Sequence, residues 1–193
     1  MNKENLRKQF LSKRKNLTYE QLQEKSQAIS KQFFQHFNLS KIKKLHIFLP
    51  IKKQNEINTW IIIKKIQKNY PHIILIISKS DFKTYNMTSY ILDSLTKIVE
   101  NRLGIPEPVQ AKKCHDYTID MILIPLLCFD KQGFRVGYGK GFYDRFIQKI
   151  RPNIIKIGLS LFEPVDKIDN KNNKDLKLDY CVMTKNVLTT SEN

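Results

Sequence analysis

The sequence lacks the features that mark membrane, secreted and zinc-binding proteins. No apolar run approaches the roughly 18 residues that span a bilayer, and the first ten residues are charged and polar, unlike a secretory signal. Cysteine is rare. Cys114, Cys128 and Cys181 are an odd number without a C-x-x-C pair, so neither a disulfide framework nor a zinc site is indicated. We therefore expect a reduced, cytoplasmic protein that does not bind membranes.

Acidic residues are few, and arginine is scarcer still. The chain has 18 Asp and Glu against 34 Lys and Arg, for a formal net charge of +16. Such a charge can indicate nucleic-acid binding, because clustered cations displace counterions from polyphosphate. Lysine outnumbers arginine 28 to 6, however, whereas specific phosphate and base contacts favour the bidentate arginine fork. The composition favours a lysine-rich surface with one local anion site and no specific nucleic-acid partner; a basic nucleic-acid-associated protein stays the alternative.

Glycine is also scarce, and its placement is informative. Of the six glycines in 193 residues, four lie in "GFRVGYGKGFYDR", residues 133 to 145. The same segment holds Arg135, Lys140 and Asp144. Glycines let backbone N–H groups turn towards an anion, and a segment that needed only flexibility would rarely combine them with these charges. The segment predicts a ligand site for phosphate, with a structural turn as the alternative.

The N-terminal third is predicted to be helical. An apolar stripe marks a first basic helix and consists of Leu6, Phe10, Leu11 and Leu17. Residues 18–21 match a capping box, which opens a second helix running towards Phe37. We expect residues 1–37 to form these two helices and residues 43–184 to form the sheet and ligand site of one domain that spans residues 1–193.

The remaining pattern predicts an α/β fold with an open, mostly parallel sheet flanked by helices. Residues 43–50, 58–69 and 72–78 read as strand, helix and strand, the order of a parallel βαβ unit. Further strands are predicted at residues 86–92, 95–100, 118–130, 154–160 and 180–184, and a helix at 141–150. "RLGIPEPVQ", residues 102 to 110, holds two prolines and is expected to be an extended loop outside any element.

The glycine segment lies between a buried strand and a helix, which places it at the carboxyl edge of the predicted sheet, where ligands usually bind. The run Gly137 to Gly141 is G-x-G-x-G, so it fails the Walker A, Rossmann and kinase spacings. Backbone N–H groups and the start of the next helix would still suit a phosphate. The segment therefore indicates another class of nucleotide or phosphate binder.

At these residues the chain resembles the 5-formyltetrahydrofolate cyclo-ligase family, also called methenyltetrahydrofolate synthetases. The family hallmark is similar to G-x-R-[LV]-G-x-G-x-G-[YF]-Y-D after a strand ending in Phe-Asp, and residues 129–144 match it. The likeness extends to the first helix, "NEINT" at 55–59, "GIPEP" at 104–108 and "DLKLDYCVMT" at 175–184.

The resemblance implies an enzyme of folate and one-carbon metabolism. Its reaction is the ATP- and Mg²⁺-dependent cyclisation of 5-formyltetrahydrofolate to 5,10-methenyltetrahydrofolate, with release of ADP and phosphate. The formyl oxygen is a poor leaving group, so its phosphorylation lets it depart as phosphate. Such phosphoryl transfer needs chiefly positioning and charge neutralisation. Both substrates are small molecules, and we expect a monomer.

The resemblance also implies roles for single residues. Three residues are implied in catalysis: Arg135, Lys140 and Tyr143. Binding of ATP is implied for Lys3, Arg7, Arg135, Val136, Gly137, Tyr138, Gly139, Lys140, Gly141, Phe142 and Tyr143. Contacts with the folate are implied for Leu49, Glu56, Tyr138 and Phe142, and contacts with magnesium for Asp144 and Asp175. Glu56 suits a folate because a carboxylate can accept two hydrogen bonds from the amino-pyrimidine side of a pterin.

Simpler interpretations remain for several of these side chains. Asp144 could cap its own helix or form an ion pair there. Glu56 could be an acid near the start of the helix at 58–69. The basic helix could be a solvated surface. Among the histidines no metal spacing occurs, and "CHD" at 114–116 cannot converge as a nucleophile, base and orienting group, so none of these is predicted to be catalytic.

Overall fold

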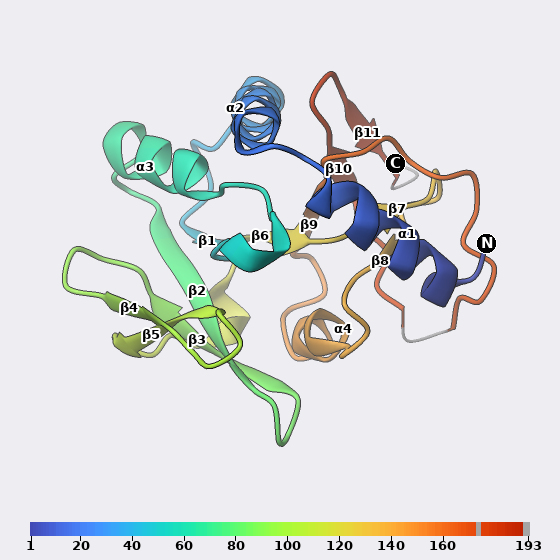
Figure 1. Ribbon diagram of the computed structural model, residues 1–193. Coiled ribbons are helices and arrows are strands. Elements are labelled where there is room, and N and C mark those ends of the chain that lie inside the picture. Colours follow the sequence, from blue (N-terminus) through green and yellow to red (C-terminus); the bar gives the residue numbers. More distant parts are fainter. Residues whose placement is uncertain (173–174, 191–193) are drawn as a thin grey trace.

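The computed structural model describes residues 1–172 and 175–190. Its centre is a mixed sheet in the order β11-β10-β9-β6-β1-β2-β3 (Figure 1). The sheet strands are β1 (Lys44–His46), β2 (Ile74–Asp81), β3 (Asn86–Ile91), β6 (Met121–Pro125), β9 (Ile155–Leu159), β10 (Tyr180–Val182) and β11 (Val187–Thr189). The five inner strands, from β10 through β9, β6 and β1 to β2, each pair with their neighbours in parallel. The edge strands β3 and β11 pair antiparallel with β2 and β10. The predicted mixed α/β fold with a mostly parallel sheet is confirmed.

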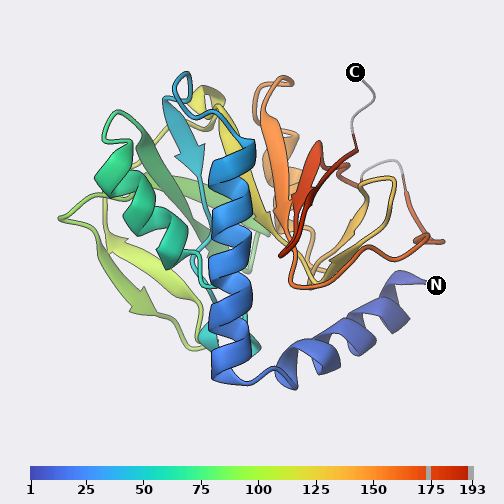
Figure 2. The same cartoon turned by 90° about the horizontal axis from the view of Figure 1, so that it is seen from above.

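Alternating side chains of the strands build a core on each face of this sheet. Leu123 of β6 belongs to the cluster beneath α2 (Tyr19–His36) and α3 (Trp60–Asn69), whereas Ile122 and Ile124 belong to the cluster that contains Phe146 of α4 (Phe142–Ile147). This period of two is what a sheet covered on both faces requires. Figure 2 shows α2 and α3 side by side over one face. Each buried strand therefore presents apolar residues to both sides.

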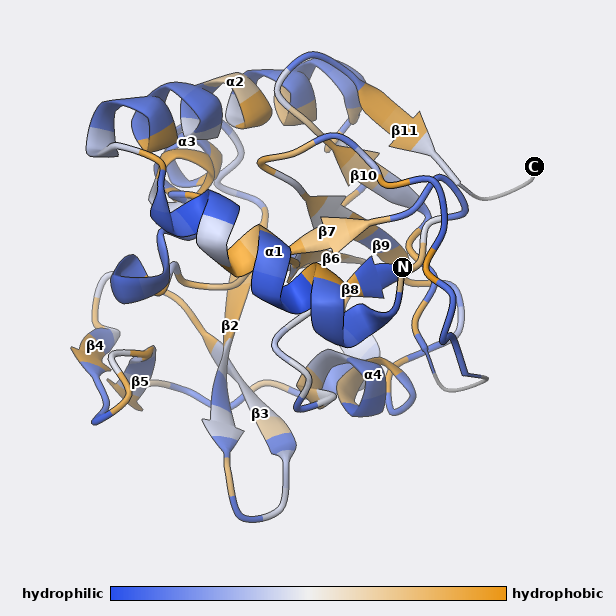
Figure 3. Cartoon of the chain, turned by 45° about the vertical axis from the view of Figure 1, so that its right-hand side comes forward, coloured by the Kyte–Doolittle hydropathy of each residue, from blue (hydrophilic) through white to orange (hydrophobic). Residues whose placement is uncertain are grey.

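Helix α1 (Lys3–Lys15) lies outside this sandwich. Its residues Leu6 and Phe10 are buried in a third cluster, against Leu127, Cys128 and Val136. Cys128 and Val136 belong to a two-stranded hairpin of β7 (Cys128–Phe129) and β8 (Arg135–Val136). Figure 3 shows α1 crossing in front of this hairpin, with its outer face hydrophilic. The start of the chain is thus packed on the segment that leads into the glycine-rich motif.

Both N-terminal helices form as predicted. The capping box of α2 is present, with the Thr18 hydroxyl and the Gln21 side chain each accepting from the other residue's backbone N–H. The predicted βαβ unit is also confirmed, because β1 and β2 pair in parallel and α3 connects them. No helix in the described part of the chain is long and apolar enough to cross a membrane.

Several predicted boundaries were wrong. The run at 118–130 is divided, since β6 ends at Pro125 and Cys128 begins the separate hairpin. Helix α4 ends at Ile147 instead of residue 150, and β1 covers only three residues. The edge strand β11 was not predicted at all. Apolar runs continue through buried loops as well as strands, so hydrophobicity alone overstated the length of these elements.

The expectation of a loop at 102–110 was wrong in part. Residues Pro106–Gln110 form β5, which pairs antiparallel with β4 (Lys97–Glu100) in a two-stranded ribbon. Residues two apart in a strand direct their N–H groups to the same side. Pro106 and Pro108 therefore remove donors from one edge only and leave the other edge free to pair, as is usual for proline in edge strands.

Candidate active site

The glycine loop, residues 137–141, follows β8 at the carboxyl side of the parallel strands and leads into α4. The backbone N–H groups of residues 138–141 donate to no other group within the described parts of the chain. Arg7 of α1 lies against this loop, and its Nε donates to the carbonyl of Gly137 at 3.0 Å. Free backbone donors beside a guanidinium are suited to an anion.

Gly139 allows this close approach of α1 to the loop. Its φ is +89°, and a Cβ at this position would lie 2.9 Å from Nη2 of Arg7. A side chain here would be strained by the backbone and would also displace the guanidinium. The predicted ATP contacts Arg7 and Gly139 therefore lie together, although they are far apart in the sequence.

A second cation, Arg135, lies just before the glycine loop. Arg135 of β8, whose side chain is 7% exposed, donates from Nη1 to Oδ1 of Asp144 in α4 at 2.9 Å. The same Asp144 oxygen accepts from the N–H of Leu176 at 3.1 Å. Burial acts to raise the pKa of Asp144, but Arg135 and the Leu176 N–H outweigh it, so that the net shift is downward. Asp144 is therefore ionised at neutral pH, and Nε of Arg135 has no partner within the described residues.

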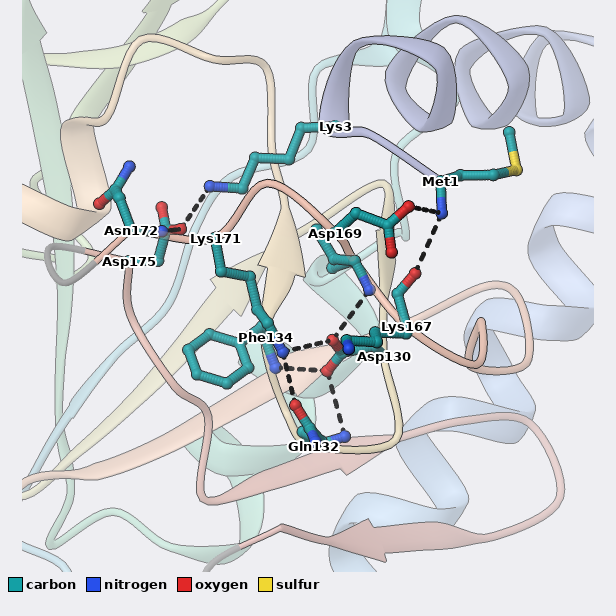
Figure 4. Close-up of polar contacts among 11 residues, drawn as sticks. Met1, Lys3, Asp130, Gln132, Phe134, Lys167, Asp169, Lys171, Asn172 and Asp175 are labelled. Carbon is teal, nitrogen blue, oxygen red and sulfur yellow. Dashed lines mark hydrogen bonds and ion pairs between the residues drawn. The ribbon is translucent and has the colours of Figure 1, made fainter.

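The C-terminal segment brings a second carboxylate to the same place. Lys3, in the first turn of α1, forms an ion pair with Oδ2 of Asp175, and the N–H of Asn172 donates to that same oxygen at 2.7 Å (Figure 4). Leu176, whose N–H contacts Asp144, directly follows Asp175. The predicted metal residues Asp144 and Asp175 thus belong to one cluster, and each is paired with a predicted ATP contact.

This donor set is suitable for a magnesium ion that also contacts phosphates. No group of three or more His, Cys, Asp or Glu side chains that could hold a metal occurs in residues 1–172 and 175–190. Magnesium needs no such cage, because it usually keeps several waters and binds through one or two carboxylates and substrate phosphates. Asp144 and Asp175 provide these two carboxylates, so the residues present fit the ion.

The other predicted loop residues differ in exposure. Lys140 is exposed, whereas Val136 is buried beneath α1. Phe142 packs edge-on against Phe82, with 5.1 Å between ring centroids, at the tip of the β2–β3 hairpin. Tyr143 packs edge-on against His46 at 6.0 Å. Burial lowers the pKa of His46 to about 3, so this ring is neutral and is a packing residue, not an acid catalyst.

The predicted folate residue Glu56 contacts the glycine loop. Its Oε1 accepts from the hydroxyl of Tyr138 at 2.8 Å, and its Oε2 accepts from the N–H of Ile51 at 2.8 Å. Glu56 is buried and, with Arg14, lines a small pocket whose other walls are mainly apolar: Phe48, Ile57, Pro125, Leu126, Leu159 and Leu161. Leu49 is also buried, in the large core cluster. Tyr138 thus links the glycine loop to a residue that lines the pocket.

Two residues that organise this region were given no role from the sequence, although Asp130 belongs to the matched motif. Arg14 is 3% exposed, and its Nη2 donates to the hydroxyl of Tyr138. Asp130 is fully buried and accepts from the N–H groups of Gln132 and Phe134 at 3.1 and 3.0 Å, which fixes the turn before the glycine loop (Figure 4). Arg14 lies four and eight residues from Phe10 and Leu6, and this spacing could have identified it as a buried member of the stripe.

Comparisons with known proteins show the family of this chain. The model of the 5-formyltetrahydrofolate cyclo-ligase family matches residues 1–183. A 5-formyltetrahydrofolate cyclo-ligase of Mus musculus is 29% identical over 154 residues, which cover 76% of this chain and 74% of that protein. One of Mycoplasma pneumoniae is 28% identical over 167 residues, covering 83% and 85% respectively.

Solved structures give the same result. The NMR structure of Aquifex aeolicus 5,10-methenyltetrahydrofolate synthetase has a TM-score of 0.83 at 27% identity and covers 100% of this chain and 95% of that one. The structure of the Mycoplasma pneumoniae 5,10-methenyltetrahydrofolate synthetase has a TM-score of 0.75 at 25% identity, with 96% and 100% covered. Given a family match over nearly the whole chain and this shared fold, the chain belongs to the 5-formyltetrahydrofolate cyclo-ligase family.

Proposed function

We propose that this protein uses ATP to convert 5-formyltetrahydrofolate to 5,10-methenyltetrahydrofolate and releases ADP and phosphate. The observation that carries the proposal is the meeting of three kinds of group at one loop. The free backbone donors at 138–141 lie beside Arg7, the carboxylates of Asp144 and Asp175 pair with Arg135 and Lys3, and Tyr138 joins the loop to Glu56. Family membership supports the same reaction.

The roles follow from the chemistry of phosphoryl transfer. The glycine loop, Lys3, Arg7 and Lys140 hold the phosphates of ATP, and Arg135 neutralises charge on the group in transfer. A magnesium ion bound through Asp144 and Asp175 would neutralise further charge on the phosphates. Val136 and Gly137 shape the entry to the loop. Leu49, Glu56, Tyr138 and Phe142 hold the folate, and Tyr143 positions the formyl group next to the phosphates.

The chemical reason for ATP is the formyl oxygen. Transfer of the γ-phosphoryl group to this oxygen forms one P–O bond and breaks the bond to ADP. The neighbouring folate nitrogen then attacks the formyl carbon, the C–O bond breaks, and the oxygen departs with phosphate. The chain's own side chains bind and orient both substrates so that this transfer occurs in line.

A direct assay tests the proposal. The protein is mixed with ATP, magnesium and 5-formyltetrahydrofolate, and the absorbance of the methenyl product is followed. Product should require all three components, and ATP hydrolysis should require the folate. Absence of product, together with steeply salt-dependent binding to any polyanion, would instead support the basic nucleic-acid-associated alternative.

The α1 contacts give a first mutational prediction. Lys3 and Arg7 are four residues apart on one helix face, where Lys3 pairs with Asp175 and Arg7 contacts the glycine loop. We expect the Lys3→Ala, Arg7→Ala double variant to raise the KM for ATP at least about tenfold, the effect of losing roughly 1.4 kcal/mol. Steady-state kinetics at varied ATP concentration measure this change.

The matched control uses two other lysines of α1. Lys8 pairs with Glu4 on the exposed face, at 3.0 Å, and Lys15 is exposed. The Lys8→Ala, Lys15→Ala variant should keep the KM for ATP within about a factor of two, because exposed charges contribute little. If both pairs raise KM equally and high salt abolishes the effect in both, α1 acts only through general positive charge.

Glu56 gives a second prediction. Glu56→Gln replaces one of two carboxylate acceptors by a donor, so we expect the Kd for 5-formyltetrahydrofolate to rise about thirtyfold, or about 2 kcal/mol. The Kd for ATP should change less than about twofold, as the glycine loop is intact. Calorimetric titration with each ligand separates the two effects, and equal loss of both affinities would mean that Glu56 is structural.

A further inference from the structure

Arg14 is a buried cation in α1 that no part of the proposed reaction uses. Its side chain is directed at the glycine loop, where Nη2 donates to the hydroxyl of Tyr138 and Cζ lies 5.3 Å from the centroid of that ring. Only 3% of Arg14 is exposed, and no partner of its Nε lies in the described chain. A buried arginine costs free energy unless its contacts compensate, so its place calls for an explanation.

The contacts of Arg14 form one continuous chain that ends at Glu56. Arg14 donates to the Tyr138 oxygen, and the Tyr138 hydroxyl donates to Oε1 of Glu56 at 2.8 Å. The N–H of Ile51 holds the other carboxylate oxygen at 2.8 Å. Because a hydroxyl has a single proton, the Arg14 donation to its lone pair directs that proton to Glu56. The orientation of the Glu56 carboxylate is therefore determined from both ends.

We propose that Arg14 is a positioning residue which, through the Tyr138 hydroxyl, keeps the Glu56 carboxylate ionised and oriented for the folate. This inference rests on the proposed function for its ligand, but the chain of hydrogen bonds is a property of the ligand-free protein. It makes α1 a determinant of the folate pocket as well as a neighbour of the ATP loop.

The charges around Glu56 support this role. Burial raises the pKa of Glu56, whereas Arg14, the Ile51 N–H and the Tyr138 hydroxyl lower it in part. The groups that face Glu56 are Arg14 from α1, Tyr138 from the glycine loop and Tyr143 from α4, and burial raises the pKa of both tyrosines, which are therefore neutral. Arg14 is thus the cation that favours the ionised carboxylate. Its removal should raise the pKa of Glu56, so that the ionised form decreases near neutral pH and returns as the pH rises.

The Arg14 side chain can be removed without releasing the surrounding backbone. Asn55, next to Glu56, donates from Nδ2 to the backbone carbonyls of Arg14 and Leu17 at 3.2 and 3.3 Å. These carbonyls persist in any variant of residue 14. Leu6 and Phe10 also hold α1 in place through their own apolar cluster. A variant that lacks only the guanidinium is therefore expected to fold.

The test compares Arg14→Met with Lys15→Met, which removes the same charge from the exposed adjacent position. At neutral pH we expect Arg14→Met to raise the Kd for 5-formyltetrahydrofolate about tenfold and to leave the Kd for ATP within about twofold. The loss should shrink as the pH is raised towards 9. Lys15→Met should match the wild type throughout. A pH-independent loss, or an equal loss of both ligands, would overturn the inference.

A second variant and a ligand-free measurement complete the test. Tyr138→Phe removes the bridging hydroxyl from a partly exposed ring and should weaken folate binding in the same pH-dependent way. Carboxyl ¹³C NMR, with the Glu56 signal assigned from Glu56→Gln, should show a higher titration midpoint in Arg14→Met. If wild-type protein binds no folate, the proposed function fails while NMR still decides the role of Arg14. If folate binds but neither affinity nor midpoint changes, the role of Arg14 is refuted and the function stands.

Discussion

Replacement of Asp144 by asparagine is expected to lower kcat by about 100- to 1000-fold, which is roughly 3 to 4 kcal/mol of transition-state stabilisation. The reason is charge. The pKa of Asp144 is shifted downward, so the carboxylate is ionised at neutral pH and can hold a cation that neutralises the phosphates. Asparagine keeps an oxygen in the same position but loses this charge. Single-turnover and steady-state kinetics measure the effect.

Stability should change far less in this variant. The amide oxygen of the substituted side chain can still accept from Arg135 and from the N–H of Leu176, the partners of Asp144 within residues 1–172 and 175–190. We expect the free energy of unfolding to fall by about 1 kcal/mol or less. Asp166→Asn is the matched control, because Asp166 pairs with Lys131 on the exposed surface. Wild-type turnover in Asp144→Asn, or an equal loss of turnover in both variants, would remove Asp144 from the site.

Among these variants, Gly133→Ala is expected to have the largest effect on stability, with a loss of about 3 kcal/mol in the free energy of unfolding. Gly133 has a φ of +89°, and a Cβ there would lie 2.5 Å from Oγ1 and 2.7 Å from Cβ of Thr190. It would also lie 3.0 Å from the carbonyl of Leu178, which as backbone cannot move aside easily. Backbone strain and overpacking thus act together. Denaturant unfolding measured by circular dichroism gives the loss.

Gly137→Ala is the control for this prediction. A Cβ at Gly137 would meet no atom within 4 Å, and its φ is outside the left-handed region. The free energy of unfolding should change by no more than about 0.5 kcal/mol. A similar loss in the two variants would show that an added methyl group destabilises both positions regardless of its neighbours, and that the contact with Thr190 is unimportant.

The sequence was most informative where local patterns decide structure. The capping box at Thr18 depends on residues three apart, and the βαβ unit on consecutive apolar segments, so both could be predicted. The division of 118–130 into β6 and the β7–β8 hairpin depends on packing against α1, which no local pattern reveals. The prolines at 106 and 108 were misleading because their effect depends on which edge of the strand is paired.

The same distinction applies to the site. The glycine segment could be recognised because its residues are close together in the sequence. The ion pair of Lys3 with Asp175 joins residues 172 positions apart, which no local pattern reveals. Arg14 was overlooked because a charged residue interrupts an apolar stripe, although its burial continues that stripe. The predicted catalytic and binding roles stay predictions until the variants are measured.

Contacts of α1 with much later parts of the chain constrain how the protein forms during synthesis. Lys3 is 172 residues away from its partner Asp175, and Arg7 is 130 residues away from Gly137. The ribosome completes α1 long before it makes residues 127–136, against which Leu6 and Phe10 pack. The nascent chain must therefore carry α1 with its apolar face uncovered while the strands up to β6 emerge. The groups around the glycine loop can be assembled only after nearly all of the chain has been translated.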